Sequence, residues 1–297
     1  MRSYDGSLME NIPKFKDLLE EYERSIEEKR RGLGRRLVEF LDLKRMDEKK
    51  GWWLRVLDRR RVVGVDGSQI SPLRELGIPI GVVQVAKFWV VHGEGKYGVD
   101  YKTSFVGVEH NLDLARFELE MNVLKEEMDG KSWLFVDGSL CPFSTDQRLR
   151  DEYLKKTNEI LRMSENTGTP MVGYVDKSFS KDLAKSLGLD VYDVFLLSGV
   201  MDPFTYTRPF GNKIKYAYVS VYPSAPVRVE YPAWMEDMHD EIVKVVLAEC
   251  LLGKTRGYPY ILERAHHYSC IDAKARANFM KAVKSYSISM KWMSKIR

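Results

Sequence analysis

Two short segments of the sequence have the same form, and each contains an acidic residue at the same place. Residues 62–68 are Val-Val-Gly-Val-Asp-Gly-Ser, and residues 133–139 are Trp-Leu-Phe-Val-Asp-Gly-Ser. In each segment four mostly apolar residues predict a buried strand, and Asp66 or Asp137 follows where the strand emerges, which is where open α/β sheets place their sites. Asp-Gly is also a common turn signal, so either segment alone has a purely structural explanation. Together they predict two carboxylates held close on adjacent strands.

Two neighbouring carboxylates repel each other unless a cation neutralises them, and oxygen-rich sites of this kind suit Mg²⁺ or Mn²⁺. Glu118 and Glu120 lie on a predicted helix over residues 112–128, on opposite flanks of its apolar stripe. Either one could point toward the strand ends, or both are solvated flank residues. The order Asp, Glu on the first crossover helix, Asp matches the layout of RNase H-like metal nucleases, in which carboxylates bind two divalent ions.

The rest of the chain supplies the elements that would hold these residues in place. The pattern of apolar residues predicts strands over residues 61–66, 80–91, 101–108, 132–137, 170–176, 214–222 and 227–231. It predicts helices over residues 12–46, 112–128, 145–166, 180–187, 236–252 and 271–292, the first broken near Gly32 and Gly34. We therefore expect an α/β fold with an RNase H-like central mixed sheet, flanking helices, and helical N- and C-terminal extensions.

Six motifs resemble, in their order and spacing, those of the NurA nuclease family. They are Val65-Asp-Gly-Ser68, Arg116-Phe-Glu-Leu-Glu120, Leu134-Phe-Val-Asp-Gly-Ser-Leu140, Gly173-Tyr-Val-Asp-Lys-Ser178, Met201-Asp-Pro-Phe-Thr-Tyr-Thr-Arg-Pro-Phe210 and Tyr258-Pro-Tyr-Ile-Leu-Glu-Arg-Ala-His266. The resemblance implies a nuclease dependent on Mn²⁺, with Mg²⁺ possible and two ions expected. It implies degradation of DNA from 5′ to 3′, cutting of single strands, and a homodimer that acts with a HerA-type hexameric ATPase in resecting double-strand breaks.

The resemblance also implies roles for individual residues. Asp66 and Asp137 would be metal ligands, and Glu120, rather than Glu118, would be a third. His266 would be a further ligand or a proton-transfer group. The adjacent His267 is the alternative, because neighbouring side chains on a helix point about 100° apart. Residues 1–60 would form an N-terminal helical extension for partner or dimer contacts, and residues 61–297 the NurA-type RNase H-like nuclease domain.

Two further groups of residues are candidates for binding DNA or assisting its cleavage. Tyr174 and Lys177 would stand at the end of a third central strand, where lysine can hold the scissile phosphate and tyrosine can orient water or stack on a base. Tyr206, Arg208 and Phe210 form an aromatic and basic run in a proline-containing loop. Such a run suits unpaired bases and phosphates, although a loop tied down by buried aromatic residues explains it equally well.

Several other classes of protein are excluded. Residues 93–98, Gly-Glu-Gly-Lys-Tyr-Gly, spell a dinucleotide-binding fingerprint, but a strand follows instead of a helix, so we expect a hairpin turn. Gly253-Lys-Thr255 lacks the earlier glycine of a phosphate-binding loop, because that position is Ala248. Three cysteines at unrelated spacings form no metal motif or disulfide framework and favour a reducing compartment. With neither a signal peptide nor a membrane span in the sequence, we expect a cytoplasmic protein.

The small net charge of +4 hides an uneven distribution. Residues 24–61 and residues 273–297 each carry +7, so the other 234 residues carry −10. Basic ends can hold a polyanion, although two solvated helix faces explain them as well. The N-terminal helices, with Leu18, Tyr22 and Leu37, are candidates for contacting a hexamer or a second subunit. A non-catalytic DNA-binding adaptor of a motor ATPase remains the alternative function, and RNA or a branched junction the alternative substrate. Three glutamines in 297 residues favour a thermophilic source.

Overall fold

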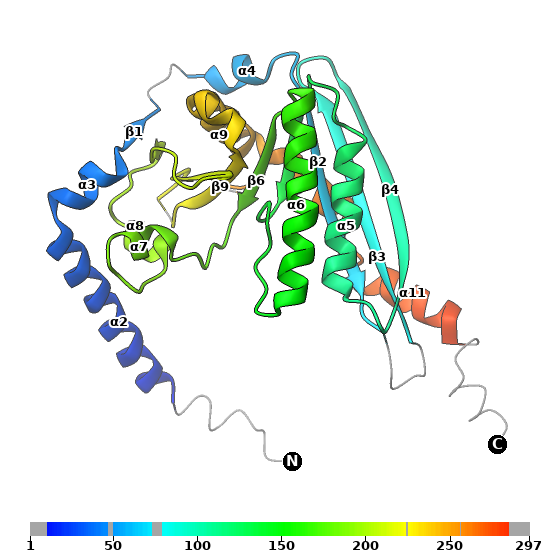
Figure 1. Ribbon diagram of the computed structural model, residues 1–297, viewed down its shortest axis with the longest axis horizontal. Helices are drawn as coiled ribbons and strands as arrows, with labels where there is room; N and C mark the ends of the chain where they lie inside the picture. Colours follow the sequence, from blue (N-terminus) through cyan, green and yellow to red (C-terminus); the bar gives the residue numbers. More distant parts are fainter. Residues whose placement is uncertain (1–10, 47–49, 73–78, 224, 256, 285–297) are drawn as a thin grey trace. The chain divides into compact units, whose positions relative to one another are not determined.

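The computed structural model describes residues 11–46, 50–72, 79–223, 225–255 and 257–284 (Figure 1). The chain divides into two compact units. The smaller unit consists of Met1–Arg45, Lys177–Arg208 and Tyr218–Val227, and the larger unit of Met46–Asp176, Pro209–Ala217 and Arg228–Arg297. The boundary expected at residue 60 falls inside the larger unit, and the functional division that it marks stays a prediction.

A mixed sheet forms the centre of the larger unit. Its strands lie in the order β9-β6-β5-β2-β3-β4. They are β2 (Arg61–Ile70), β3 (Ile80–Val91), β4 (Lys96–Gly107), β5 (Trp133–Asp137), β6 (Met171–Val175) and β9 (Val227–Pro232), and β8 (Ile214–Val219) precedes β9 in the chain. Strands β2, β3 and β4 are antiparallel, β5 and β6 continue the sheet parallel to β2, and β9 is antiparallel to β6. Three antiparallel strands followed by two parallel ones confirm the predicted RNase H-like arrangement.

Helices cover both faces of this sheet. Helices α5 (Leu112–Lys125) and α6 (Gln147–Thr167) lie side by side over one face (Figure 1). Phe117 and Met121 of α5 join Val63 and Val65 of β2 in one buried core. Helix α10 (Tyr260–Ser269) packs on the same two strands, β2 and β3, from the other face, and contacts α9 (His239–Leu252). The remaining elements of this unit are α4 (Trp52–Leu57), η2 (Ala233–Met238) and α11 (Ala273–Lys284).

Side-chain hydrogen bonds, local for α5 and α6 and distant for α10, explain where these helices begin. The side chain of Asn111 accepts a hydrogen bond from the Leu114 amide at the start of α5, and Asp146 does the same for the Leu149 amide at the start of α6. Helix α10 is capped from a distance, because the buried carboxylate of Glu249 on α9 accepts a hydrogen bond from the Ile261 amide at 2.9 Å. Glu249 also contacts Nε2 of His92 at 2.6 Å. This buried carboxylate therefore fixes the first turn of α10.

The hairpin between β3 and β4 confirms the predicted turn in place of a dinucleotide-binding loop. Gly93 and Gly95 have φ of +78° and +68°, a conformation that glycine adopts without strain. Strand β4 begins at Lys96, so the fingerprint is followed by a strand and not by a phosphate-binding helix. The predicted helix over residues 271–292 corresponds to α11 as far as Lys284, and its remainder lies outside the described residues.

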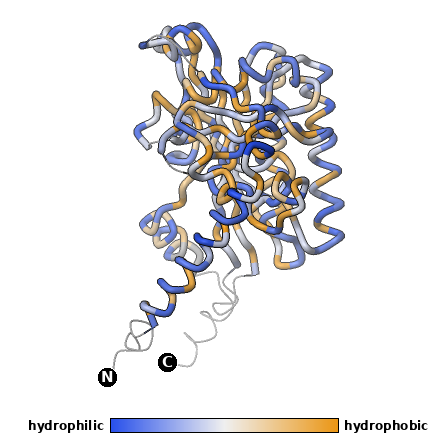
Figure 2. Tube along the Cα trace, turned by 90° about the vertical axis from the view of Figure 1, so that its left-hand side faces the viewer, coloured by the Kyte–Doolittle hydropathy of each residue, from blue (hydrophilic) through white to orange (hydrophobic). Residues whose placement is uncertain are grey.

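The smaller unit is mainly helical. It contains α2 (Ile12–Leu33), α3 (Arg35–Leu41), α7 (Asp182–Ser186) and α8 (Asp193–Leu197), with β1 (Lys44–Arg45) paired to β7 (Thr205–Tyr206). The predicted break in the N-terminal helix occurs at Gly34, where φ is +48°. Helix α2 alternates hydrophilic and hydrophobic residues along its length (Figure 2), and Leu18 on it is exposed. Leu37 is buried, so the prediction that it is available to a partner was wrong.

No helix in the described part of the chain is long and apolar enough to cross a membrane.

Candidate metal centre

Strand β2 directs Asp66 toward helix α10. Alternate residues of a strand face opposite sides of the sheet, so Gly64 and Asp66 share one face while Val65 and Gly67 share the other. A Cβ atom at Gly64 would lie only 2.7 Å from the backbone oxygen of Ile261, so glycine lets α10 rest directly on the strand. This close approach brings His266 of α10 to the aspartate, with Nδ1 at 2.9 Å from Oδ2 of Asp66.

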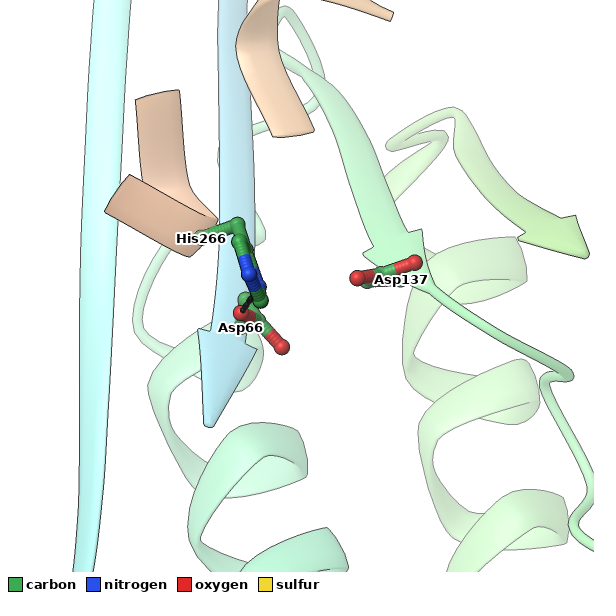
Figure 3. A group of neighbouring side chains, drawn as sticks. All are labelled: Asp66, Asp137 and His266. Carbon is green, nitrogen blue, oxygen red and sulfur yellow. Dashed lines mark hydrogen bonds and ion pairs between the residues drawn. The ribbon is translucent and has the colours of Figure 1, made fainter. Parts of the chain in front are cut away.

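Asp66 of β2, Asp137 at the end of β5 and His266 of α10 form a cluster. Each offers one ligand atom, and these atoms all lie within 4.8 Å of one another. Figure 3 shows Asp137 at the end of the β5 arrow, Asp66 on β2 before the tip of its arrow, and His266 reaching Asp66 from α10. The two carboxylates that the sequence predicts to be neighbours are therefore neighbours in space.

Hydrogen bonds fix the Asp66 carboxylate in this position. Its Oδ2 atom accepts a hydrogen bond from the Ser269 hydroxyl at 2.6 Å, and its Oδ1 atom accepts one from the Gly67 amide at 2.8 Å. The Ser68 hydroxyl in turn donates to the Ser269 carbonyl. Strand β2 and the end of α10 are thus tied together around one carboxylate.

Asp137 is held by a different part of the chain. It is half-buried and accepts a hydrogen bond from the hydroxyl of Tyr258, which stands just before α10. Burial raises the pKa of Asp137, the hydrogen bond from Tyr258 opposes this rise, and the charge of Asp66 adds to it. Burial likewise raises the pKa of Tyr258 above its ordinary value, so this hydroxyl keeps its proton and remains a donor.

Glu120, the predicted third carboxylate ligand, is buried near the cluster but is not one of the residues whose ligand atoms all lie within 4.8 Å of one another. It projects from α5 on the opposite side of β2, where a Cβ atom at Gly67 would lie only 2.5 Å from its Oε1 atom. Burial raises the pKa of Glu120 to about 8; Arg116, whose Nε lies 3.9 Å from Oε1, lowers it, and the charges of Asp66 and Asp137 raise it. Because Gly67 lacks a side chain, Glu120 can approach β2 closely enough to interact with the charges of Asp66 and Asp137.

This set of residues fits a divalent cation. The carboxylates of Asp66 and Asp137 and the imidazole of His266 supply hard oxygen and nitrogen donors, which Mg²⁺ and Mn²⁺ accept, and Glu120 is a further carboxyl group nearby. Burial is the main cause of the raised pKa of Glu120, and the charges of Asp66 and Asp137 add to it. A cation nearby would offset both effects, because it favours the charged form of the carboxyl group.

The alternative ligands considered from the sequence have other contacts. The carboxylate of Glu118 pairs with Lys156 of α6 at 3.2 Å. His267 is exposed, and its ring contacts that of Tyr268. His266, and not His267, belongs to the cluster of ligand atoms, and the choice of Glu120 over Glu118 stays a prediction.

Tyr174 takes a supporting position. Its side chain is completely buried, and its hydroxyl donates a hydrogen bond to the carbonyl of Gly257, next to Tyr258. Its own carbonyl accepts a hydrogen bond from the Gly138 amide at 2.8 Å. Tyr174 therefore holds the segments around Asp137 and Tyr258, a positioning role instead of the predicted contact with water or a base. Lys177 belongs to the smaller unit, and its role at the scissile phosphate stays a prediction.

The predicted DNA-binding run has contacts within the protein. Tyr206 is buried. Nε of Arg208 donates to the carbonyl of Phe40 at 2.9 Å, and its guanidinium lies over the Phe40 ring. Phe210 stacks on Tyr216. These contacts are typical of the tied-down loop that the sequence leaves open as the alternative, and the DNA-binding role of the run stays a prediction.

The sequence analysis missed Glu230 and Arg228, which hold the turn that follows Asp137 in place. Glu230 is buried, and its Oε2 atom accepts hydrogen bonds from the Ser139 hydroxyl at 2.8 Å and the Leu140 amide at 3.0 Å. Its Oε1 atom accepts one from Nε of Arg228 at 2.7 Å. A signal for them was present in the sequence, because Arg228 and Glu230 carry opposite charges in an otherwise apolar strand. Residues two apart on a strand share one face, so the two side chains could be expected to pair.

The fold and this cluster of acidic residues define an RNase H-like protein with a candidate divalent-metal centre. The chain belongs to the NurA family, because the NurA domain model matches residues 60–271. This match confirms the resemblance found in the sequence motifs.

Solved structures support the same fold. The NurA nuclease from Sulfolobus solfataricus superposes with a TM-score of 0.66 at 16% identity, over 96% of this chain and 97% of that one. A structure described as NurA with manganese superposes with a TM-score of 0.54 at 12% identity, over 93% and 98% of the two chains. Among curated proteins, no sequence matches significantly.

Proposed function

We propose that this protein is a divalent-metal-dependent deoxyribonuclease whose metal ligands are Asp66, Asp137, Glu120 and His266. The observation that carries the proposal is the convergence of ligand atoms from Asp66, Asp137 and His266 within 4.8 Å, beside a carboxyl group whose pKa is raised to about 8. The similar structure that is described with manganese supports Mn²⁺ as the ion, with Mg²⁺ as a possible substitute and two ions expected.

The residues of the chain have separate tasks in this proposal. Bound divalent ions would supply an activated water and neutralise the leaving oxygen. Asp66 and Asp137 hold the ions, and Glu120 releases its proton when it becomes a ligand. His266 donates Nδ1–H to Asp66, which leaves Nε2 as the nitrogen that can bind an ion or exchange a proton with water.

The finer activity follows the family resemblance. We propose 5′ to 3′ exonuclease and single-strand endonuclease activity on DNA, in end resection at double-strand breaks. A homodimer would work with a HerA-type hexameric ATPase in the cytoplasm. Residues 253–255 do not complete a phosphate-binding loop, so ATP would be bound and hydrolysed by that separate ATPase.

The test is cleavage of linear duplex and single-stranded DNA by the purified protein with Mn²⁺ and with a chelator. Asp66→Ala and Asp137→Ala should abolish cleavage while keeping the fold, whereas Asp151→Ala, at an exposed position of α6, should cleave normally. Undiminished cleavage by both Asp66→Ala and Asp137→Ala would refute the proposal. Binding that weakens with salt, without any cleavage by the unchanged protein, would instead identify the DNA-binding adaptor. Preferential cleavage of RNA or junctions would correct the substrate.

A further inference from the structure

A cavity of about 350 Å³ adjoins the metal centre on the side of α5 and α6. Glu120 and Asp137 form part of its wall, so whatever fills it lies next to the proposed ions. Helix α5 contributes Arg116, and the loop that follows β5 contributes Ser139 and Phe143. The volume is within the range of pockets that hold small ligands, which begins at about 300 Å³.

Phe143 gives this cavity an aromatic wall that the fold does not bury. Its side chain is 80% exposed, although it stands only six residues after Asp137. The guanidinium of Arg150 lies 5.4 Å from the centre of the ring and is itself held by the carbonyl of Ser144 at 3.0 Å. Arg150 thus contacts the ring while most of its surface stays exposed. An exposed aromatic ring held by a cation is a platform on which an unpaired base can stack.

Arg116 gives the cavity a positive charge, and its Nε atom makes no hydrogen bond to the described residues. One of its terminal nitrogens donates to the Gly67 carbonyl at 3.3 Å. Its Nε lies 3.9 Å from Glu120, beyond hydrogen-bond length, and has no hydrogen-bond partner among the described residues. A guanidinium beside a cluster of carboxylates and ions is suited to a phosphate, which its fork of donors can grip.

We propose that this cavity binds the nucleotide that flanks the scissile phosphate, with its base stacked on Phe143 and its phosphate next to Arg116. The proposal rests on the nuclease function proposed above and adds a preference for substrate. A base can lie flat on Phe143 only when it is unpaired, so the cavity selects single strands or frayed ends. Stacking accepts any base, so the selection is independent of sequence.

The experiment separates stacking from phosphate contacts. The full chain carrying Asp66→Asn, in chelator so that no DNA is cut, is titrated with a labelled twelve-nucleotide oligothymidylate and with a chain of the same length that has no bases. Adding Phe143→Ala should weaken oligothymidylate binding about 5- to 150-fold and leave binding of the baseless chain unchanged. Phe143→Trp should restore binding. Arg116→Gln should weaken binding of both chains by similar factors.

Phe105→Ala is the matched control, because Phe105 on β4 is 70% exposed but does not line the cavity. The proposal is overturned if Phe143→Ala binds oligothymidylate as tightly as its parent, if it weakens both chains equally, or if Phe105→Ala has the same effect. Cleavage by the unchanged protein is measured separately. A base-dependent loss without cleavage would support the subsite while refuting the nuclease, and cleavage without such a loss would do the reverse.

Discussion

Glu120 shows how the site is built at the scale of single residues. Burial raises the pKa of its carboxyl group to about 8, Arg116 lowers it in part, and the charges of Asp66 and Asp137 raise it further. In the metal-free protein it therefore keeps its proton at neutral pH. A divalent ion would have to displace that proton, so the affinity for the ion should increase as the pH rises toward 8.

The same group predicts how stability depends on pH. The pKa of Glu120 rises from 4.5 to about 8 on folding, so the folded state binds the proton more tightly than the unfolded state. The free energy of unfolding therefore loses a contribution as the pH rises from 5 to 8. Glu120→Gln should remove this loss, making the variant more stable than the unchanged protein at pH 8 and similar at pH 5.

The measurement is urea unfolding in chelator at several pH values. Glu118→Gln is the control, because Glu118 pairs with Lys156 and should leave the pH dependence as it is. Parallel pH profiles for Glu120→Gln and the unchanged protein would show that the carboxyl group titrates normally.

The sequence predicted the residues of the site that lie in repeated or recognisable motifs. Asp66 and Asp137 follow two strands of the same form, and both reach the cluster. Ser269 was missed because it is 203 residues from the aspartate that it binds, and an isolated serine carries no local signal. Tyr258 belongs to a recognised motif, but only the folded chain shows that its hydroxyl meets Asp137.

At the scale of elements, the contact between β2 and α10 decides whether His266 reaches Asp66. The position of Gly64 leaves no room for a side chain, because the backbone of Ile261 would lie 2.7 Å from a Cβ atom. Gly64→Ala should push α10 away and cost about 1–3 kcal/mol of stability, as overpacked cores do. It should also weaken Mn²⁺ binding.

Gly32→Ala is a matched control for that substitution. Gly32 lies within α2, and nothing lies within 4 Å of a Cβ atom there, so alanine should be neutral or stabilise by about 0.5–1 kcal/mol. Thermal unfolding and calorimetric Mn²⁺ titration of both variants provide the comparison. Unchanged Mn²⁺ affinity in Gly64→Ala would mean that the placement of α10 does not govern the centre.

Length alone did not decide which elements were predictable: the five-residue strands β5 and β6 match predicted segments, whereas the ten-residue helix α10 is absent from the predicted helices. Strand β3 has the predicted bounds, because twelve residues of apolar pattern outweigh local irregularities. Strand β2 continues to Ile70, beyond the predicted end at Asp66, because its pairing with β3 carries it through the Asp-Gly turn signal. Helix α8 and strands β1 and β7 have five, two and two residues, too few to show a period.

At the scale of the whole molecule, the net charge of +4 is the sum of basic and acidic stretches that would serve different purposes. The acidic middle of the chain contains the proposed metal ligands, and the basic stretches at either end can attract a polyanion that carboxylates alone would repel. Bound ions would add positive charge to the acidic part. A protein with a nearly neutral net charge can therefore still act on nucleic acid, because that net charge does not include the bound metal ions.

The N-terminal helix carries the prediction about a partner. Phe15 and Leu18 on α2 are 61% and 56% exposed, an apolar pair that a docking partner would cover. Phe15→Glu with Leu18→Glu should abolish association with the proposed HerA-type hexamer and leave cleavage of DNA by the isolated nuclease intact. Leu54→Glu, at an exposed position of α4, is the control. Co-elution on a sizing column reports association, and an unchanged complex would rule out docking through α2.

The central claim is that Asp66 and Asp137 hold a catalytic divalent ion together with Glu120 and His266. The most direct test is a crystal structure of the protein soaked in Mn²⁺, with anomalous scattering to locate the ion. We predict at least one Mn²⁺ peak about 2.0–2.6 Å from carboxylate oxygens of both aspartates, with Glu120 and not Glu118 in the same shell. A map without a peak between the aspartates, or with Mn²⁺ bound only elsewhere, would contradict it.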